Sequence, residues 1–166
     1  MAELTPLERL QPCLLDRLTD EEPLKTEEGR NQRVISLPRY KRGVLRDLEW
    51  LFNASAHLPE EGRERFCLED YPQAFRSVIN FGTRQLCGLI APNMLELERQ
   101  MIEAIQLFEP RILRQTLTVK AKMERHLIFF EMYAELWANP VPEKLFIKTK
   151  IDLETGACNL GESANG

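Results

Sequence analysis

The residues of this chain whose types and spacing could do chemistry are a glutamate and an arginine on either side of a proline, Glu109-Pro110-Arg111. The tripeptide lies between a helical pattern and a segment with the two-residue alternation of a strand. A carboxylate at the C-terminus of a helix faces the negative end of the helix dipole, which is unfavourable by up to about 1 kcal/mol. Glu109 therefore needs a compensating charge from the chain or from a partner, and Arg111 is the first candidate.

Glycoside hydrolysis is the catalytic alternative, since such enzymes need only two carboxyl groups. Glu109 could be the acid of such a site. However, the neighbouring Arg111 favours the charged carboxylate, whereas a general acid must hold its proton. Glu131 and Glu135 alternate along the chain as residues on an exposed strand face do. We therefore predict that the chain is not an enzyme.

Other kinds of site lack the residues that they require. No glycine-rich loop links a strand to a helix, and no GxSxG motif is present, so nucleotide binding and a serine nucleophile have no support. His57 and His126 lack the spacing to a carboxylate and a nucleophile that a catalytic histidine needs. The cysteines are scattered, so we expect free thiols and neither a metal site nor a cofactor. They are Cys13, Cys67, Cys87 and Cys158.

The composition predicts an ordinary globular domain that binds neither nucleic acid nor membranes. The 166 residues are 43% hydrophobic and 29% charged, and the formal net charge is -4, whereas a nucleic-acid-binding surface normally shows a basic excess. No apolar run reaches the roughly 20 residues of a membrane span, and the N-terminus lacks the pattern of a secretion signal. We expect a cytoplasmic protein without membrane insertion.

Two helices precede the tripeptide. The first is predicted from Ser36, a candidate N-cap, to Asn53, because apolar residues recur there at steps of three and four. The second is predicted to begin at Asn93, an N-cap with Glu96 three residues later. It must end by Glu109, because a residue that precedes proline avoids the α region.

Strands follow the tripeptide. After Pro110 the apolar period changes from 3.6 to 2, and the residues expected on one face are Leu113, Leu117, Val119 and Ala121. Residues 126–137 and 145–153 predict two further strands, and residues 71–88 predict a short helix followed by a turn. Short connections favour an antiparallel β-meander of three to four strands, packed against two to three helices in an α+β domain.

Two features of these strands bear on a partner. In an extended segment Arg111 shares a face with Glu109 and Leu113, so we expect it to point towards buried surface or towards another subunit. A helix-to-strand clamp within one chain is the alternative. The strand at residues 126–137 is apolar on both faces. It is either a central strand covered by helices on both sides, or a strand with one face awaiting another subunit.

Residues 34–160 are predicted to form this single domain, between an N-terminal arm in residues 1–33 and a flexible tail in residues 161–166. The arm is polar and turn-prone except for an apolar cluster around Leu14, Leu15 and Leu18, which predicts a short anchoring helix. A disordered tail is the alternative for the arm.

Four segments resemble, in order, the TssE family of type VI secretion baseplate subunits. They are LLDRLTD at 14–20 with Pro23, VLRDLEWLFN at 44–53, RSVINFG at 76–82 with Gly88, and IEAIQLFEPRI at 102–112. The resemblance covers about residues 14–153, and the chain departs from the family's pattern at Thr83-Arg84-Gln85. The TssE family is related to baseplate wedge proteins of contractile-tailed phages, which are often labelled lysozyme-like.

The resemblance implies a structural, non-enzymatic component of the baseplate, with peptidoglycan hydrolysis as the alternative. It implies TssF, TssG and TssK as wedge partners and a position where the TssB/TssC sheath begins to polymerise. The family's motif implies a structural contact in the wedge at Glu109, Pro110 and Arg111. The docking segment of the arm is expected to comprise Leu14, Leu15, Arg17 and Leu18.

Overall fold

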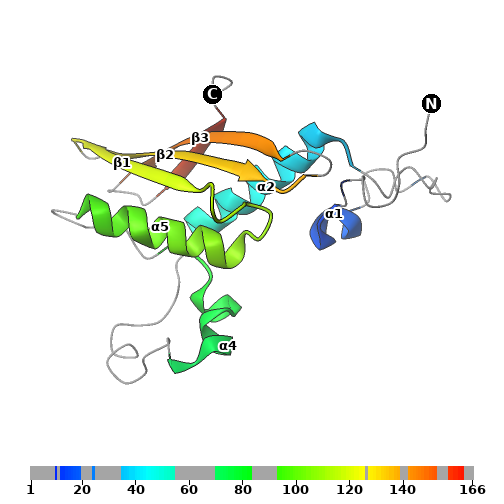
Figure 1. Cartoon of the computed structure of the whole chain (residues 1–166), viewed down its shortest axis with the longest axis horizontal. Helices are drawn as coiled ribbons and strands as arrows, with labels where there is room; N and C mark the ends of the chain where they lie inside the picture. The colour runs from blue at the N-terminus through cyan, green and yellow to red at the C-terminus, as the bar shows by residue number, and fades with distance from the viewer. Residues whose placement is uncertain are drawn as a thin grey trace.

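The computed structural model describes residues 10, 12–19, 24, 35–54, 70–83, 93–125, 127–138, 142–152 and 157–162. They confirm the predicted α+β class (Figure 1). The helical elements are α1 (Leu14–Leu18), α2 (Leu37–Asn53), α4 (Pro72–Phe75), the 3-10 turn η4 (Val78–Asn80) and α5 (Met94–Phe108). The strands are β1 (Thr118–Glu124), β2 (Leu127–Leu136), β3 (Glu143–Asp152) and β4 (Cys158–Glu162).

The strands form one antiparallel sheet in the order β1-β2-β3-β4, so the predicted meander is confirmed. β4 is the strand for which the sequence gives no clear signal, because Asn159 and Gly161 have low strand propensity. It ends at Glu162, two residues into the segment expected to form the tail.

The long helices begin near the predicted residues, but only one of the two predicted caps forms. The Asn93 side chain accepts a hydrogen bond from the Leu95 N–H at 3.1 Å, which confirms this N-cap. Glu96 accepts a hydrogen bond from Gln100 instead of from the backbone of the cap, so the capping box is not completed. Ser36 precedes α2 without a side-chain cap bond.

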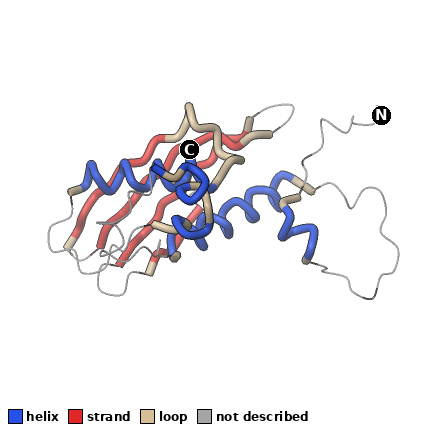
Figure 2. The backbone as a smooth tube through the Cα atoms, turned by 90° about the horizontal axis from the view of Figure 1, so that it is seen from below, coloured by secondary structure: helices blue, strands red, loops and turns tan. Residues whose placement is uncertain are grey.

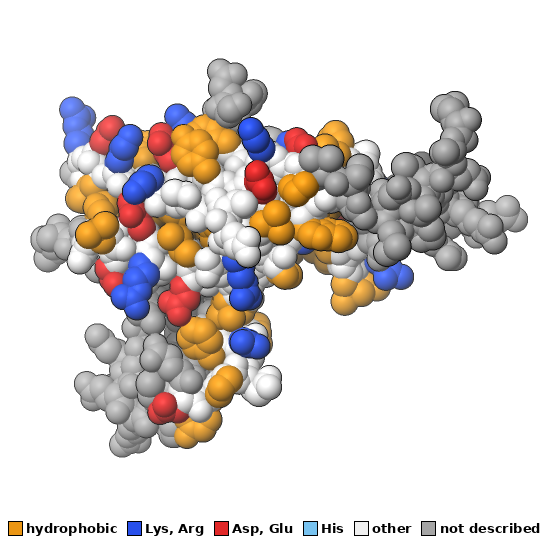
Figure 3. All heavy atoms as spheres, viewed as in Figure 1, with side chains coloured by type: hydrophobic (Ala, Val, Ile, Leu, Met, Phe, Trp, Pro, Cys, Tyr) orange, Lys and Arg blue, Asp and Glu red, His pale blue; other side chains and the backbone are white. Residues whose placement is uncertain are grey.

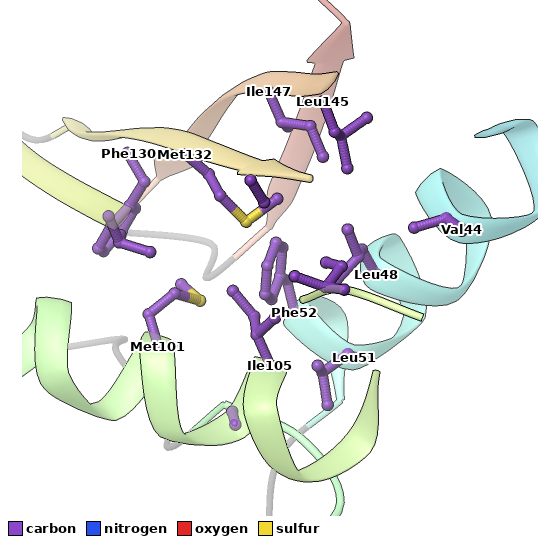
Figure 4. Close-up of a cluster of buried hydrophobic side chains, with 14 of the residues drawn as sticks. Val44, Leu48, Leu51, Phe52, Met101, Ile105, Phe130, Met132, Leu145 and Ile147 are labelled. Atoms are coloured by element: carbon purple, nitrogen blue, oxygen red, sulfur yellow. The ribbon is translucent and has the colours of Figure 1, made fainter. Parts of the chain in front are cut away.

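Helices α2 and α5 lie on the same face of the sheet (Figure 2). Along β2 the even-numbered side chains are buried against them, and the odd-numbered ones are partly or largely exposed. Figure 4 shows the side chains that meet in this core, among them Leu48, Phe52, Met101, Ile105, Phe130 and Ile147. β2 is thus a central strand, but among the described elements no helix covers its second face. Of the two alternatives for this strand, the described elements therefore favour the one with one face open to another subunit.

Two helix side chains occupy the outer edges of the sheet. Asn53, at the end of α2, accepts the N–H of Cys158 and donates to its carbonyl oxygen, each at 3.0 Å. Glu98 of α5 accepts the N–H of Ala121 in β1 at 2.7 Å. Both contacts satisfy backbone groups that an edge strand otherwise leaves free, so the helices are joined to the sheet through its edges as well as its face.

Replacing Asn53 with alanine is expected to loosen β4, because two hydrogen bonds to Cys158 are lost. At about 0.5–1.5 kcal/mol for each bond, the free energy of unfolding should fall by about 1–3 kcal/mol. Denaturant unfolding measures the loss, and faster exchange of the Cys158 amide locates it. The control is Asn159→Ala at an exposed position of the same strand, expected to change stability by less than about 0.5 kcal/mol. Equal losses in both variants would contradict the edge role of Asn53.

Candidate functional site

The Glu109-Pro110-Arg111 segment is a turn and not the start of a strand. α5 ends at Phe108, the Glu109 N–H still donates to the Ile105 carbonyl at 2.8 Å, and the Ile112 N–H donates back to the Glu109 carbonyl at 3.2 Å. Ile112 is the buried residue here, 3% exposed, and β1 begins only at Thr118. The predicted alternation holds from Leu117 to Ala121 but is wrong at Leu113, and Arg111 shares no strand face with it.

Arg111 binds its own glutamate. Its Nε donates to Oε1 of Glu109 at 2.6 Å and its Nη2 to Oε2 at 2.5 Å, a bidentate pair, and its backbone N–H also donates to Oε1 at 3.2 Å. The Glu109 side chain is 4% exposed. The compensating charge that the helix dipole demands is therefore supplied within the chain. The sequence predicted an extended segment at this point. The chain turns instead, and the turn brings the Arg111 side chain against Glu109.

The pair extends into a network of alternating charges that joins three elements. Asp47 of α2 accepts from Arg111 Nη2 at 2.5 Å through one oxygen. Its other oxygen accepts from Arg46 Nε and Nη2 at 2.9 and 2.8 Å. Arg46 Nη1 donates in turn to Asp16 of α1 at 2.6 Å. The network thus connects the arm, the first long helix and the seam between α5 and the sheet.

Each arginine of the network is held in its charged form. Burial alone would lower the pKa of Arg111, but its hydrogen bonds to Glu109 and Asp47, and their negative charges, raise that pKa above its ordinary value. The same balance, with Asp16 and Asp47 as partners, raises the pKa of Arg46. The guanidinium groups therefore stay charged across the pH range in which the protein folds.

Backbone contacts fix the turn against the end of β2. The Arg111 carbonyl accepts the Trp137 N–H at 2.7 Å, and the Leu113 N–H donates to the Glu135 carbonyl at 2.9 Å. The Tyr40 hydroxyl of α2 donates to the Trp137 carbonyl at 2.9 Å. Burial raises the pKa of Tyr40, so this hydroxyl remains a donor at neutral pH. The position of the guanidinium is therefore set by both helix and sheet.

The predicted docking residues of α1 face away from the domain. Leu14 and Leu18 are 71% and 73% exposed, Leu15 and Arg17 are also exposed, and α1 buries no residue. The described contacts of α1 with the network instead come from Asp16 and from Cys13, whose Sγ lies 3.5 Å from Arg46 Nη2.

Gly43 permits the close approach of α1. A Cβ atom at Gly43 would lie 3.2 Å from Oδ2 of Asp16, closer than ordinary van der Waals contact, and 3.8 Å from Nη1 of Arg111. A side chain there would crowd the carboxylate that binds Arg46. This glycine therefore serves the packing of the arm against α2.

Protonating Asp16 is expected to release α1 from α2. Burial opposes the charged carboxylate, but hydrogen bonds from Cys13 and Arg46 and the Arg46 charge hold the pKa of Asp16 below its ordinary value of 3.8. A carboxylate whose pKa is lowered by folding stabilises the contact above its ordinary pKa. That contribution is lost as the pH falls from about 3.8 through the lower folded value. The Arg17 amide chemical shift should move towards its unfolded position over this range, and in Asp16→Asn it should lie there at every pH. A wild-type shift in Asp16→Asn would contradict the contact.

The geometry does not fit catalysis. Both oxygens of Glu109 are occupied by donors of Arg111, and the carboxyl group is buried, so no substrate oxygen reaches it. Burial, with a smaller effect of Glu49, raises the pKa of the Cys158 thiol to about 12, so it is not a nucleophile at neutral pH. Within the described residues no three His, Cys, Asp or Glu side chains form a group that could hold a metal ion.

Several sequence-based expectations can be placed only in part. Cys13 and Cys158 are free thiols, as predicted. His57, His126, Cys67 and Cys87 lie outside the described residues. Asp47 and Asp16 were not predicted as site residues. Their only sequence signal is a carboxylate next to an apolar helical stripe, which is common on solvated surfaces.

The ion-pair network joins helices and sheet, and the carboxylate oxygens of Asp16, Asp47 and Glu109 are all occupied within the chain. A family model described as baseplate wedge protein gp25 matches residues 39–141, more than half of the chain. The chain belongs to this family, whose members are structural, non-enzymatic components of a contractile, phage-tail-like baseplate, with other baseplate subunits as partners. No curated protein and no solved structure matches it. None of the described helices is both long and apolar enough to cross a membrane.

Proposed function

We propose that the chain is the TssE-type wedge subunit of a type VI secretion baseplate, acting in the cytoplasm with TssF, TssG and TssK. Family membership supports a place in a wedge, and the four resembling segments support the type VI system. The observation that carries the proposal is that the Glu-Pro-Arg turn is closed within the chain and still reachable at its surface.

The reachable part of the turn is Pro110, which is exposed, together with the 19% of the Arg111 side chain that solvent reaches. Arg111 uses Nε and Nη2 for Glu109 and Asp47, and its Nη1 donates to no described residue. Pro110 and the neighbouring Trp137 are exposed. A guanidinium that is already fixed loses little conformational freedom when it binds a further acceptor. In this proposal a wedge partner places carboxylate or carbonyl oxygens against Nη1.

The exposed leucines of α1 supply a second contact. Asp16 holds the helix on Arg46, so Leu14 and Leu18 are presented to the outside beside the network. Apolar side chains in that position gain about 1.5–3 kcal/mol each when a partner buries them fully. Leu15 and Arg17 complete the same short surface.

The outer edge of β4 is the proposed starting point for the sheath proteins TssB/TssC. The backbone groups of Cys158 point away from β3, because Asn53 binds them from outside. By the two-residue alternation, those of Leu160 point the same way. Asn53 already occupies the groups of Cys158. A strand from a sheath subunit would therefore pair with the edge at Leu160, through backbone hydrogen bonds.

The proposal is tested by co-purifying the tagged chain with co-expressed TssF and TssG. Arg111→Glu is expected to lose the partners, whereas Arg114→Glu, the same change at an exposed residue three positions later, retains them. Leu14→Ser/Leu18→Ser is expected to lose partners with an unchanged Tm, because neither side chain is buried. Full capture by both the Arg111 variant and the leucine variant would show that neither contact exists.

A further inference from the structure

The face of the sheet opposite α2 and α5 carries apolar side chains between lysines, a pattern that a face exposed only to water does not need. We call it the open face, and its central residues are Lys120, Lys122, Leu127, Phe129, Glu131, Tyr133, Phe146, Lys148 and Lys150. An antiparallel sheet with one face in water normally alternates apolar and polar residues. β2 instead places Leu127, Phe129 and Tyr133 on this side as well. Figure 3 shows basic, acidic and hydrophobic side chains interspersed over the strands.

The strand register gives this face an apolar line, interrupted by Glu131, with lysines on both sides. Phe129 lies between Lys122 of β1 and Lys150 of β3. One step along β2, Glu131 lies between Lys120 and Lys148 in the same way. The central four positions on the flanking strands are therefore all lysine, and each of the four is exposed.

An aromatic pair continues the apolar line. Tyr133 stacks on Phe146 of β3, with ring centroids 4.3 Å apart and an interplanar angle of 24°. The Lys148 ammonium lies 5.6 Å from the centroid of the Phe146 ring and 3.5 Å from Glu131. This part of the surface is ordered by its own contacts before any partner arrives.

The local charge is opposite to that of the chain. Four exposed lysines surround one glutamate at the centre of the open face, whereas the whole chain carries a net charge of -4. At one end of the face the sign reverses, because Glu124 and Asp152 flank Leu127, whereas at the other end Glu135 lies opposite the exposed Lys144. The basic area is thus bounded by two carboxylates at the Leu127 end and by one glutamate opposite a lysine at the Tyr133 end. A long polyanion such as nucleic acid would meet these carboxylates, so the pattern favours a short acidic segment.

We propose that the open face binds an amphipathic helix of a partner protein, with an apolar stripe flanked by carboxylates. The stripe lies along Leu127, Phe129 and Tyr133. Carboxylates at i and i+4 on a helix are about 6 Å apart, which matches lysines two residues apart on a strand, at about 6.6 Å. One such pair on each flank of the stripe meets the lysines of β1 and those of β3.

The test uses synthetic helical peptides of about 20 residues with the intact chain. One peptide has a leucine stripe flanked by glutamates, and its control has lysines in place of the glutamates. The glutamate peptide is expected to bind at least about tenfold more tightly, by fluorescence anisotropy. Lys122→Glu/Lys150→Glu should weaken its binding by at least about tenfold. Arg99→Glu/Arg114→Glu, an equal charge change at exposed residues outside the face, should change it less than about twofold.

The proposal is overturned by equal binding of the two peptides, by no binding of either, or by equal effects of the two double variants. Binding of an oligothymidine that is lost in Lys122→Glu/Lys150→Glu would assign the face to nucleic acid instead. All four substituted residues are exposed, so we expect both double variants to fold. Melting curves check this. The face shares no residue with the seam around Arg111, so the failure of one proposal leaves the other standing.

Discussion

Replacing Glu109 with alanine is expected to lower the free energy of unfolding of the isolated chain by about 3–5 kcal/mol. The substitution removes a carboxylate that is 4% exposed and leaves Arg111 with Asp47 as its remaining partner. A partly buried guanidinium that loses its bidentate acceptor keeps its desolvation cost without the compensating bonds. In a chain of this size, each kcal/mol corresponds to about 2–4 °C in Tm.

Glu131→Ala provides the matched control for that measurement. Glu131 also forms an ion pair within the chain, with Lys148 at 3.5 Å, but both side chains are far more exposed than Glu109. An exposed pair contributes about 0–1 kcal/mol. Thermal or denaturant unfolding should therefore separate the two variants clearly. Similar small losses in both would mean that the Glu109–Arg111 pair does not hold the seam together.

Replacing Phe130 with alanine is expected to destabilise the chain by about 3–5 kcal/mol. Phe130 is 2% exposed and lies in the core between sheet and helices (Figure 4). Removing its ring leaves a cavity beneath α5, which the surrounding side chains fill only in part. Denaturant unfolding gives the magnitude, and an unchanged m-value would show that the change lies in stability alone.

The adjacent Phe129 offers an internal comparison, because it has the same side chain on the opposite face of the same strand. No described helix covers it, so Phe129→Ala should cost no more than about 1 kcal/mol. The same variant should weaken binding of the acidic peptide, whereas the ring of Phe130 does not reach the open face. If both substitutions destabilised the chain equally, the assignment of a single buried face would be wrong.

The helices and the meander were predictable because they depend on local periodicity. The stripe of α2 repeats at three and four residues, and in β3 buried residues alternate with exposed lysines, so each pattern specifies its element without knowledge of the rest. Turn chemistry was harder to read. Residues between Pro110 and Thr118 alternate by chance with the period of a strand, yet they form a turn that places Ile112 in the core.

The ion-pair network could be predicted only where its partners are neighbours in sequence. Glu109 and Arg111 are two residues apart, and the dipole of α5 already indicates that the carboxylate needs a cation. Asp47 lies 64 residues from Arg111, and Asp16 lies 30 residues from Arg46. Their pairing follows from how α1, α2 and α5 pack, which no local pattern contains. The short β4 is not apparent in the sequence for a related reason. It is held by hydrogen bonds to β3 and to Asn53, which are distant in the sequence.

The central claim is that Arg111 has two roles: it closes the turn within its own chain and offers its remaining edge to a wedge partner. The most direct test is a charge exchange between Asp47 and Arg111, compared with the single variant Arg111→Glu. Tm and co-purification with TssF and TssG are measured for each protein. Adding the single variant Asp47→Arg completes the cycle that isolates the interaction free energy between positions 47 and 111.

We predict that Arg111→Glu loses both stability and partners. Adding Asp47→Arg should recover more than about half of the lost Tm, because an arginine again neutralises the carboxylates of the turn. It should not recover the partners, because no guanidinium then stands at position 111. Recovery of both Tm and co-purification would contradict the account and reduce Arg111 to an internal clamp.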